Sequence, residues 1–414
     1  MPQDVGKSRL FHFHKLWKSL CDQKELPPVD RFLTEYFRKN KQYGRRDRRE
    51  YADLLYTVFR RGIYLAHRYL SGKSQAFAKS SPSLPHDPPA VWRLLRHIPY
   101  EDLWEYLHES LETYALKSPF LSMVHPSYEA YFKKRAHFSN WGEDSQQKFF
   151  LFLNKRPPLW LRLNYPEKKA LVLHELRSLS LKAQEYDLPD ITAIRVEGER
   201  GIYELRSYRE GLFEIQDLAS QWIGAQVQAR PGMFVWDACA GGGGKTLLLA
   251  SVMQNKGVIY ASDIREFKLR HTKLRARRAQ FSNIRYVGWD GSNLPLFPRE
   301  VDRHGGFDRV LVDAPCSASG TWRRNPDAMY RFSLGKLPEL LDLQRKLILK
   351  ASCAVRPGGL LVYATCSWLV EENEEIAQFF IQEAKDFSMV SQDIYGFPYH
   401  DCDLMYAAVF RKVK

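Results

Sequence analysis

The sequence predicts an α/β protein whose C-terminal part is a Rossmann-like domain with a doubly wound, mostly parallel sheet. Short apolar segments in this part alternate with helical segments, and each apolar segment ends at glycine or polar residues. We expect an all-helical N-terminal region over residues 1–155, a small mixed α/β module over residues 156–230 and the Rossmann-like domain over residues 231–414. A chain of 414 residues accommodates two or three domains.

Helices are predicted for most of the N-terminal region. Residues 26–69 have helical character, with an apolar stripe at spacings of three to five residues. Its members are Tyr51, Leu54, Leu55, Val58 and Ile63. The stretch SSPSLPHDPP, residues 80–89, is rich in proline and serine and is expected to be a loop. Helical sequence resumes at Val91 and continues to about Lys155.

Strands are predicted in both later parts of the chain. Leu159, Leu161 and Leu163 alternate with other residues, which indicates a strand, and the segments ITAIRVEG and LFEIQDLAS indicate more. In the C-terminal domain the predicted strands are FVWDAC, GVIYASD, IRYVGWD, FDRVLVDAPC and GGLLVYATC, with helices such as KTLLLASVMQN and FKLRHTKLRARRAQ between them.

The charge of the chain points to a polyanionic partner. Lysine and arginine number 62 against 48 acidic residues, a net charge of +14, and nucleic acid explains this excess better than a lipid surface. Residues 38–50 hold seven basic and two acidic residues, which form either a contact to an RNA backbone or a solvated helix end. Because no long apolar run and no secretory signal is present, we expect a cytoplasmic protein without membrane contact.

The segment DACAGGGGKT, residues 237–246, follows the first predicted strand of the C-terminal domain. A triphosphate loop of the Walker type would need glycine where Cys239 stands. The dinucleotide pattern G-x-G-x-x-G also fails, because Thr246 or Leu247 occupies the place of its third glycine. The loop nevertheless brings bare backbone close to a ligand and opens a helix.

Four predicted strands end in or are followed by an aspartate: Asp237, Asp263, Asp290 and Asp313. Ligands of doubly wound sheets bind at this edge, and Asp263 is suited to bind both hydroxyls of a ribose. Asp290 is a candidate acceptor for an adenine amino group. A nucleoside without a triphosphate fits this set better than ATP, and S-adenosylmethionine is the leading candidate. The alternative for each aspartate is a helix cap or a turn.

Of the six cysteines, two follow predicted strands at the ligand edge, namely Cys316 and Cys366. Cys353 lies in a helical segment at core spacing, and we assign no chemistry to it, to Cys21 or to Cys402. No C-x-x-C pair occurs, and the twelve histidines form no zinc motif, so we expect no metal and free thiols.

Two thiols at one edge suggest covalent catalysis, and methylation of carbon 5 of a pyrimidine is a reaction that needs it. This carbon becomes nucleophilic only after a thiolate adds to carbon 6. A thiolate forms more readily beside cations, for which Lys245, Arg323 and Arg324 are candidates. Asp313 is a candidate to pair with the edge of the base.

From about Pro157 to its end, the chain resembles the Sun/Nop family of RNA (cytosine-5)-methyltransferases, which includes the bacterial ribosomal small-subunit methyltransferase B type. The resemblance is carried by DACAGGGGKT, Asp263, Asp290, DAPCSASGTWRRNPD, PGGLLVYATCS with EENEE, MYAAVFRK and the upstream EGLFEIQDLASQ. DNA cytosine methyltransferases place their nucleophile in a Pro-Cys motif, here Cys316, whereas the additional TCS motif favours RNA.

The resemblance implies a methyltransferase that depends on S-adenosylmethionine, with Cys366 as nucleophile and Cys316 assisting release of the methylated RNA. Lys245 and Asp313 complete the expected catalytic set. The expected cofactor contacts are Cys239, Ala240, Gly241, Gly242, Gly243, Gly244, Lys245, Asp263, Asp290 and Asp313. The implied substrate is 16S ribosomal RNA, and we expect the protein to be a monomer.

The parts before the catalytic domain are expected to bind RNA. Through YGRRDRREYADLLYTVFR the N-terminal region resembles the NusB-like helical domain of some bacterial members, and the module over residues 156–230 is expected to recognise RNA. A cytosine must be flipped or single-stranded to reach Cys366. Trp322 and Arg323 are candidates to support that base, and the alternative for Trp322 is a place in the core.

One departure from the family pattern affects the cofactor loop. Gly241 and Gly242 stand where the family usually has Ala-Pro. Since proline restricts its own backbone, this loop is expected to be more flexible and to bind the cofactor less tightly, while activity survives.

Two other functions compete with RNA cytosine methylation. The chain could methylate another substrate class, with both cysteines buried at strand ends, or it could be a non-catalytic RNA-binding ribosome assembly factor. The presence of both Cys316 and Cys366 favours the catalytic alternative.

Overall fold

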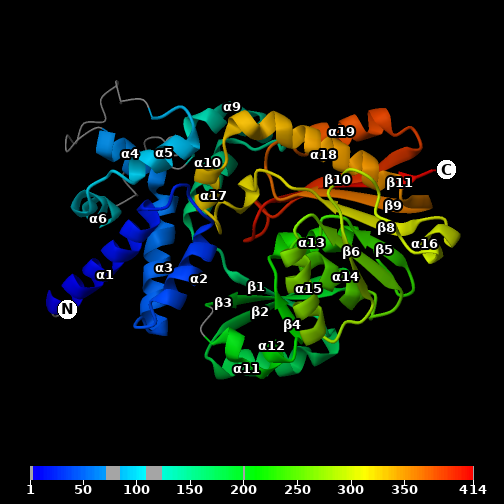
Figure 1. Ribbon diagram of the computed structural model, residues 1–414, viewed down its shortest axis with the longest axis horizontal. Coiled ribbons are helices and arrows are strands. Elements are labelled where there is room, and N and C mark those ends of the chain that lie inside the picture. The colour runs from blue at the N-terminus through cyan, green and yellow to red at the C-terminus, as the bar shows by residue number, and fades with distance from the viewer. Residues whose placement is uncertain (1–2, 71–83, 109–123, 199–200, 414) are drawn as a thin grey trace. The chain divides into compact units, whose positions relative to one another are not determined.

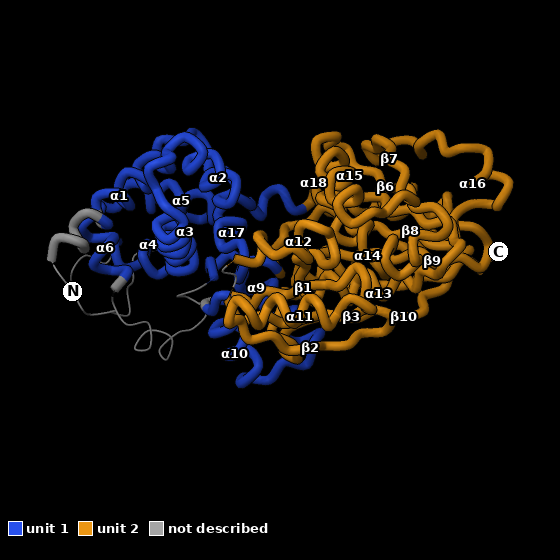
Figure 2. Tube along the Cα trace, turned by 90° about the horizontal axis from the view of Figure 1, so that it is seen from below, with its two compact units in different colours: residues 1–156, 321–337 blue, residues 157–320, 338–414 orange. Residues whose placement is uncertain are grey.

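The computed structural model describes residues 3–70, 84–108, 124–198 and 201–413. The chain forms two compact units, which Figure 2 shows in different colours. The helical unit contains Met1–Arg156 and Thr321–Leu337, and the sheet unit contains Pro157–Gly320 and Pro338–Lys414. The segment Thr321–Leu337 therefore packs with the helical unit, although its place in the sequence predicted it to be part of the C-terminal domain.

The described elements of the helical unit are all helices, which confirms the predicted all-helical region (Figure 1). None of the described helices is both long enough and apolar enough to cross a membrane. The elements are α1 Gln3–Cys21, α2 Val29–Lys39, α3 Arg45–Arg60, α4 Gly62–Leu70, α5 Pro88–Leu95, α6 Tyr100–His108, η1 Pro126–Tyr128, α9 Glu129–Phe138, α10 Glu143–Asn154, α17 Asp327–Arg331 and η5 Leu334–Lys336.

Two details of this unit differ from the sequence prediction. The helical stripe that begins at Tyr51 is divided between α3 and α4, because the first helix ends at Arg60. The proline-rich stretch was expected to be a loop throughout, but α5 begins at Pro88. Proline is well accommodated in the first turn of a helix, where its missing N–H would have no helical partner. Residues 80–83 of that stretch lie outside the described part of the chain.

The segment Thr321–Leu337 is anchored in the helical unit by α17. The buried Tyr330 hydroxyl donates to the carbonyl oxygen of Phe59 at 2.9 Å. Gly62 leaves room for this ring, since a Cβ at Gly62 would overlap the Tyr330 hydroxyl. Asp327 accepts from the backbone N–H of Val29 at 3.3 Å.

The small module forms a four-stranded antiparallel sheet in the order β2-β3-β1-β4. Strands β1 and β3 confirm predicted strands, whereas β2 was missed because most of its side chains are polar and exposed. The elements are β1 Leu159–Leu163, η2 Pro166–Lys168, α11 Lys169–Ser178, β2 Lys182–Leu188, β3 Ile191–Glu197, η3 Ile202–Glu204, α12 Arg206–Arg209, β4 Phe213–Ile215 and α13 Leu218–Gln226.

The large sheet has seven strands in the order β10-β11-β9-β8-β5-β6-β7. Strands β5 to β9 are mutually parallel and confirm the five predicted strands, while β11 and β10 are antiparallel. Strand β10, whose side chains are largely exposed, was not predicted. The strands are β5 Phe234–Asp237, β6 Val258–Asp263, β7 Ile284–Gly288, β8 Phe307–Asp313, β9 Val355–Thr365, β10 Phe387–Tyr395 and β11 Met405–Lys412.

Helices cover both faces of this sheet, as expected for a doubly wound domain (Figure 1). On one face, Val235 and Leu311 pack with apolar residues of α13, α14 and α15. On the other face, Trp236 and Val312 pack with residues of α18 and α19. The helices of this part are α14 Gly244–Val252, α15 Glu266–Arg278, α16 Arg299–Arg303, η4 Ser319–Thr321, α18 Leu337–Ser352 and α19 Glu374–Glu383.

Gly320 fits a position where the chain has no room for a side chain. Its N–H donates to the carbonyl oxygen of Cys366 at 2.9 Å, and its own carbonyl accepts from the N–H of Leu404 at 3.0 Å. A Cβ at this position would overlap the Leu404 carbonyl oxygen. The connection after β8 is thereby held against the segments that follow β9 and precede β11.

We predict that Gly320→Ala lowers the free energy of unfolding by about 1–3 kcal/mol, because the backbone must shift to admit the methyl group. Urea titration followed by circular dichroism measures this. Gly288→Ala is the control, since a Cβ at Gly288 meets no atom within 4 Å. Equal stability of the two variants would contradict the close packing described for Gly320.

Candidate active site

Three of the predicted aspartates lie at one edge of the large sheet because of its parallel register. Asp237 of β5 pairs with Ala261 of β6 and with Leu311 of β8. Each of these partners lies two residues before the end of its strand, where Asp263 and Asp313 stand. The three carboxylates therefore project from neighbouring strand ends, the usual ligand site of such sheets.

The glycine loop after β5 turns sharply into α14. Gly241 and Gly243 have φ angles of +54° and +82°, a region that favours glycine. The N–H of Gly241 donates to Asp263 Oδ2 at 3.0 Å. At Gly243 a Cβ would also overlap the side chain of Thr272 in α15. The glycines thus serve both the backbone conformation and the close approach of α15.

Asp263 is held in place by hydrogen bonds within the protein. It is 4% exposed, and Arg265 donates to it through its backbone N–H at 2.8 Å and through Nε at 3.1 Å. Burial raises the pKa of Asp263, but the bonds from Arg265 and Gly241 outweigh burial and lower it. Arg265 was not singled out from sequence. A ligand hydroxyl at Asp263 would have to share this carboxylate with Arg265, whose side chain is 56% exposed.

Asp290 lies in an exposed turn beyond β7. The register pairs Gly288 with Asp263, which places Asp290 two residues past the end of the paired strand. Its Oδ1 accepts from the N–H of Ser292 at 2.9 Å and from the hydroxyl of Ser292 at 2.6 Å. These bonds lower the pKa of Asp290. This is the turn-forming role that the sequence left open, and the adenine contact stays a prediction.

Asp237 is buried below the glycine loop. Its Oδ2 accepts from the Thr246 hydroxyl at 2.6 Å. Burial raises the pKa of Asp237 to about 7, although the bond from Thr246 opposes this. Its Oδ1 is buried with no hydrogen-bond partner among the described residues. Such an atom is costly to bury unless a ligand supplies a donor.

Lys245 brings a buried positive charge to the same edge. Its ammonium group donates to Asp313 Oδ2 at 2.7 Å, and its side chain is 8% exposed. Burial alone would lower the pKa of Lys245, but Asp313, and then Cys366, raise it above its usual value. Lys245 is therefore a cation whose charge interacts with both a carboxylate and a cysteine.

The two cysteines from the DAPC and TCS motifs meet at this edge. Cys316 Sγ and Cys366 Sγ are 3.2 Å apart, and both side chains are partly exposed. The hydrogen bond with Cys366 and then burial raise the pKa of the Cys316 thiol well above its usual value. Cys316 therefore remains a protonated thiol that can donate to Cys366. The chemical roles of both residues stay predictions.

Glu372 joins the loops that carry the two cysteines. Its Oε1 accepts from the N–H of Ser317 at 2.8 Å and from Gln344 Nε2 at 3.0 Å, and its Oε2 accepts from the Ser317 hydroxyl at 2.5 Å. The Ser317 hydroxyl also lies 3.2 Å from that of Ser367. Burial raises the pKa of Glu372, which these bonds oppose. Glu372 lies in the EENEE segment and was not among the functional residues predicted from the sequence.

Asn373 completes the link on the side of Cys366. Its Nδ2 donates to the carbonyl oxygen of Ser367 at 2.9 Å, and its Oδ1 accepts from the Thr365 hydroxyl at 2.5 Å. The residues on either side of Cys366 are therefore both bonded to a fully buried asparagine.

The prediction that Trp322 and Arg323 support the reacting base is wrong, because both side chains are buried. Trp322 is 4% exposed and packs edge-on against Tyr128. Arg323 is 2% exposed, donates to the carbonyl oxygen of Lys155 at 2.9 Å and covers the ring of Phe152. Both lie in the core of the helical unit, which is the alternative considered for Trp322.

The other cysteines differ in burial. Cys353 was expected in the core, but it is exposed because α18 ends one residue earlier. Cys402 is buried. In the glycine loop, the burial of Cys239 raises the pKa of its own thiol well above the usual value. A protonated Cys239 suits a lining position in the loop rather than a nucleophile.

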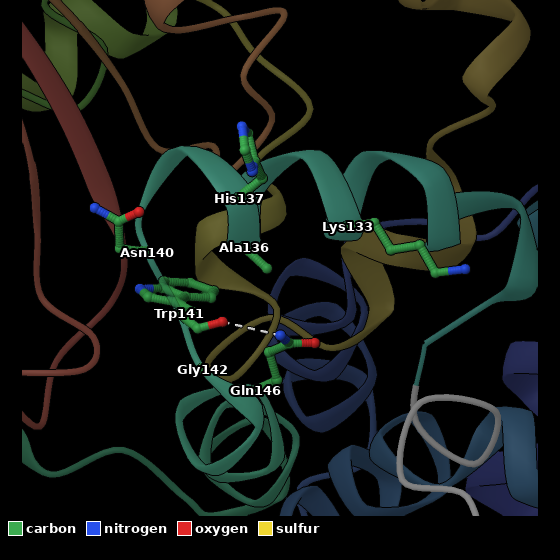
Figure 3. A pocket seen from close by; sticks show the side chains of 7 residues that line it. All are labelled: Lys133, Ala136, His137, Asn140, Trp141, Gly142 and Gln146. Atoms are coloured by element: carbon green, nitrogen blue, oxygen red, sulfur yellow. Dashed lines mark hydrogen bonds between the residues drawn. The ribbon is translucent and has the colours of Figure 1, made fainter.

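A cavity of about 420 Å³ lies in the helical unit, between α9 and α10 (Figure 3). Gln146 in its wall donates to the carbonyl oxygen of Trp141 at 2.9 Å. The wall contains no cysteine and no carboxylate, so it lacks the groups that the sheet edge combines. The lining residues are Lys133, Ala136, His137, Asn140, Trp141, Gly142 and Gln146.

The part of the chain that carries this site is similar to known methyltransferases. Residues 225–405 match the family described as 16S rRNA methyltransferase RsmB/F. The matched segment is less than half of the 414-residue chain. A probable ribosomal RNA small subunit methyltransferase B from Synechocystis sp. is 32% identical over 251 residues, 60% of this chain and 55% of that protein. The chain thus matches little more than half the length of this relative.

Solved structures show the same fold as this chain. The crystal structure of PH0851 has a TM-score of 0.72 and 22% identity, and the match covers 96% of this chain and 97% of that chain. A methyltransferase homologue from Pyrococcus horikoshii has a TM-score of 0.55 and 25% identity, with 70% and 100% of the two chains covered. The first match extends over both units of the fold.

RsmB/F methyltransferases use S-adenosylmethionine as methyl donor. The groups at the sheet edge fit this cofactor. Gly241 and Gly243 present backbone without side chains, and Asp263 is a fixed acceptor at a strand end. Asp237 Oδ1 is a buried polar atom whose hydrogen-bonding capacity none of the described residues uses. Which of these residues touch the cofactor stays a prediction.

The buried Asp237 should make stability depend on pH. Its folded pKa of about 7 lies above the usual 3.8, so the folded protein binds more protons than the unfolded chain between these values. This contribution to stability is present below about pH 4 and is lost as the pH rises to about 7. We predict that the free energy of unfolding of the wild type, relative to Asp237→Asn, falls by about 1–3 kcal/mol over this range.

Urea titrations of both proteins at several pH values measure this difference. Asp308→Asn serves as the control. Burial raises the pKa of Asp308, but the bonds from the Phe234 N–H and Arg356 outweigh burial and lower it, so its contribution changes below about pH 4 and should stay nearly constant from pH 4 to pH 7. A constant difference between wild type and Asp237→Asn from pH 4 to pH 7 would contradict the raised pKa of Asp237.

Proposed function

We propose that this protein is an RNA (cytosine-5)-methyltransferase that modifies 16S ribosomal RNA in the cytoplasm. The observation that carries the proposal is the 3.2 Å separation of Cys316 Sγ and Cys366 Sγ beside the glycine loop. A methyltransferase that transfers directly to a nitrogen or oxygen needs no thiol pair, whereas carbon 5 of cytosine requires covalent activation. The family described as 16S rRNA methyltransferase supports the RNA class.

In the proposed reaction, the Cys366 thiolate bonds to carbon 6 of the cytosine, and the electron pair of the 5,6 double bond makes carbon 5 nucleophilic. Bound S-adenosylmethionine supplies the methyl group as an electrophilic sulfonium. Loss of the proton on carbon 5 to solvent restores the double bond and expels the Cys366 thiolate. Product release thus depends on how well that thiolate is stabilised as a leaving group.

Cys316 and Lys245 act on that thiolate. The Cys316 thiol, kept protonated by its raised pKa, donates to Cys366 Sγ and stabilises it as it leaves. The Lys245 ammonium interacts with Cys366 and with Asp313, and it favours negative charge on the sulfur. Asp313, anchored by Lys245, is positioned at the edge to receive a donor from the base.

We also propose that the helical unit grips RNA through the basic run at residues 38–50. Six of its seven basic side chains are exposed, at the end of α2 and the start of α3. Phosphate contacts of this kind do not depend on sequence and weaken with salt. They would hold a structured RNA while the sheet unit acts on one base.

Cys316→Ala is expected to trap a covalent complex. Without the Cys316 thiol, elimination of Cys366 slows, and a protein–RNA adduct should survive on a denaturing gel after incubation with S-adenosylmethionine and 16S RNA. Cys366→Ala should form no adduct and lose methylation. Cys353→Ala, which removes an exposed thiol elsewhere, should behave as wild type.

An adduct that persists in Cys366→Ala would contradict the assignment of the nucleophile. Methylation that survives in Cys366→Ala would indicate direct transfer to another kind of atom. Failure of the wild type to methylate, combined with intact RNA binding, would favour a non-catalytic assembly factor.

The substrate is tested by bisulfite sequencing of total RNA from cells with and without the gene. We expect one cytosine of 16S ribosomal RNA to lose protection when the gene is absent, and to regain it with the wild type but not with Cys366→Ala. Loss of protection in transfer RNA instead would overturn the ribosomal assignment and leave the chemistry intact.

A further inference from the structure

The carbonyl groups of Gly241 and Gly242 are held by side chains of α15. These glycines occupy the positions where the resembling family has Ala-Pro. Arg275 Nη1 donates to the carbonyl oxygen of Gly242. Thr272 Oγ1 lies 3.3 Å from the carbonyl oxygen of Gly241 and 3.1 Å from that of Lys268. The two donors lie three residues apart and so on the same face of the helix.

The guanidinium of Arg275 is itself held by Glu214 of β4. Arg275 donates to Glu214 Oε2 through Nε at 3.1 Å and through Nη2 at 2.8 Å. Glu214 is 2% exposed, and its Oε1 accepts from Arg278 Nη2 at 2.6 Å. A planar guanidinium bound on one edge by a buried carboxylate has a fixed orientation. Its remaining nitrogen, Nη1, is thereby aimed at Gly242.

We propose that Arg275 is a positioning residue for the cofactor loop and that it supplies the order a proline would otherwise provide. Four successive glycines give the loop many backbone conformations, which must be lost when a ligand binds. A hydrogen bond from a fixed cation to Gly242 removes part of that freedom in advance. Glu214, Arg275 and Gly242 thus connect the small module to the cofactor loop.

The choice of S-adenosylmethionine as the ligand rests on the proposed function, whereas the contacts of Arg275 do not depend on it. We expect Arg275→Ala to raise the Kd for S-adenosylmethionine about tenfold, the value of one charge-assisted hydrogen bond. Isothermal titration calorimetry measures the Kd. The control is Arg277→Ala, which removes the same charge from an exposed position on α15 and should leave the Kd within about twofold.

A proline at residue 242 should rescue the variant. Gly242 is not among the glycines with positive φ, and a Cβ there meets Arg275 Nη1 at 3.7 Å, an ordinary contact. We expect Arg275→Ala combined with Gly242→Pro to recover most of the lost affinity, because proline restricts the same backbone. Arg275→Ala also removes a hydrogen-bond partner of the buried Glu214, so we expect it to lower the urea midpoint of unfolding. Gly242→Pro does not restore that partner, so in the double variant the midpoint should stay lowered while the Kd recovers.

Hydrogen–deuterium exchange of residues 237–246 without ligand gives a second readout. Exchange should be faster in Arg275→Ala than in wild type or Arg277→Ala, and slower again in the double variant. Should Arg275→Ala fail to fold, Arg275→Lys is the second variant. Lysine keeps the positive charge beside Glu214, but it has no planar guanidinium that can bind Glu214 and Gly242 at the same time. We therefore expect the same increase in Kd.

The outcomes separate this inference from the proposed function. If the wild type does not bind S-adenosylmethionine, the proposed function fails. If the wild type binds, but Arg275→Ala matches Arg277→Ala in both Kd and loop exchange, the positioning role of Arg275 is overturned. A raised Kd that Gly242→Pro does not lower would also overturn it.

Discussion

The pairing of β8 with β9, closed by the buried carboxylate of Glu372, is the constraint on which the site depends. In the parallel register Asp313 lies opposite Ala364, so the loops that follow both strands start side by side. The Glu372 carboxylate then accepts hydrogen bonds from the backbone N–H and the hydroxyl of Ser317. A carboxylate with this many donors inside the protein holds loops that are distant in sequence more firmly than apolar packing alone, because leaving its partners unsatisfied is costly.

The electrostatics of the sheet edge follow from the burial of an acid, a cation and a thiol close together. Asp237 is driven toward its neutral form by burial, whereas Lys245 remains charged because Asp313 faces it. Cys316 is likewise kept neutral. The result is a sheet edge where the Lys245 cation lies near the two cysteines and where the negative charge of Asp237 is reduced. Such separation of protonation states among neighbouring groups is a common feature of active sites.

Much of the fold could be predicted because strand cores and their ends are local features of sequence. The five parallel strands were predicted from short apolar runs, and β10 was missed because its side chains are mostly exposed and lack that signal. Cys353 was misplaced for a related reason: its spacing matches a helical core, but the helix ends at Ser352. The segment Thr321–Leu337 packs in the helical unit through contacts of α17 with α5 and α3. These contacts join parts of the chain that are distant in sequence, so no local pattern predicts them.

The sequence by itself determined which residues stand at the ends of the parallel strands and that the loop after β5 has almost no side chains. Those properties depend on covalent order and backbone conformation, which a linear pattern contains. Only the tertiary structure decided that Cys316 and Cys366 lie within 3.2 Å, that Glu372 joins their loops and that Arg275 is aimed at Gly242. These contacts span 33 to 55 residues, and they depend on strand order, register and helix packing. Such distances in sequence are bridged by the packing of the whole domain, and local residue preferences do not encode them.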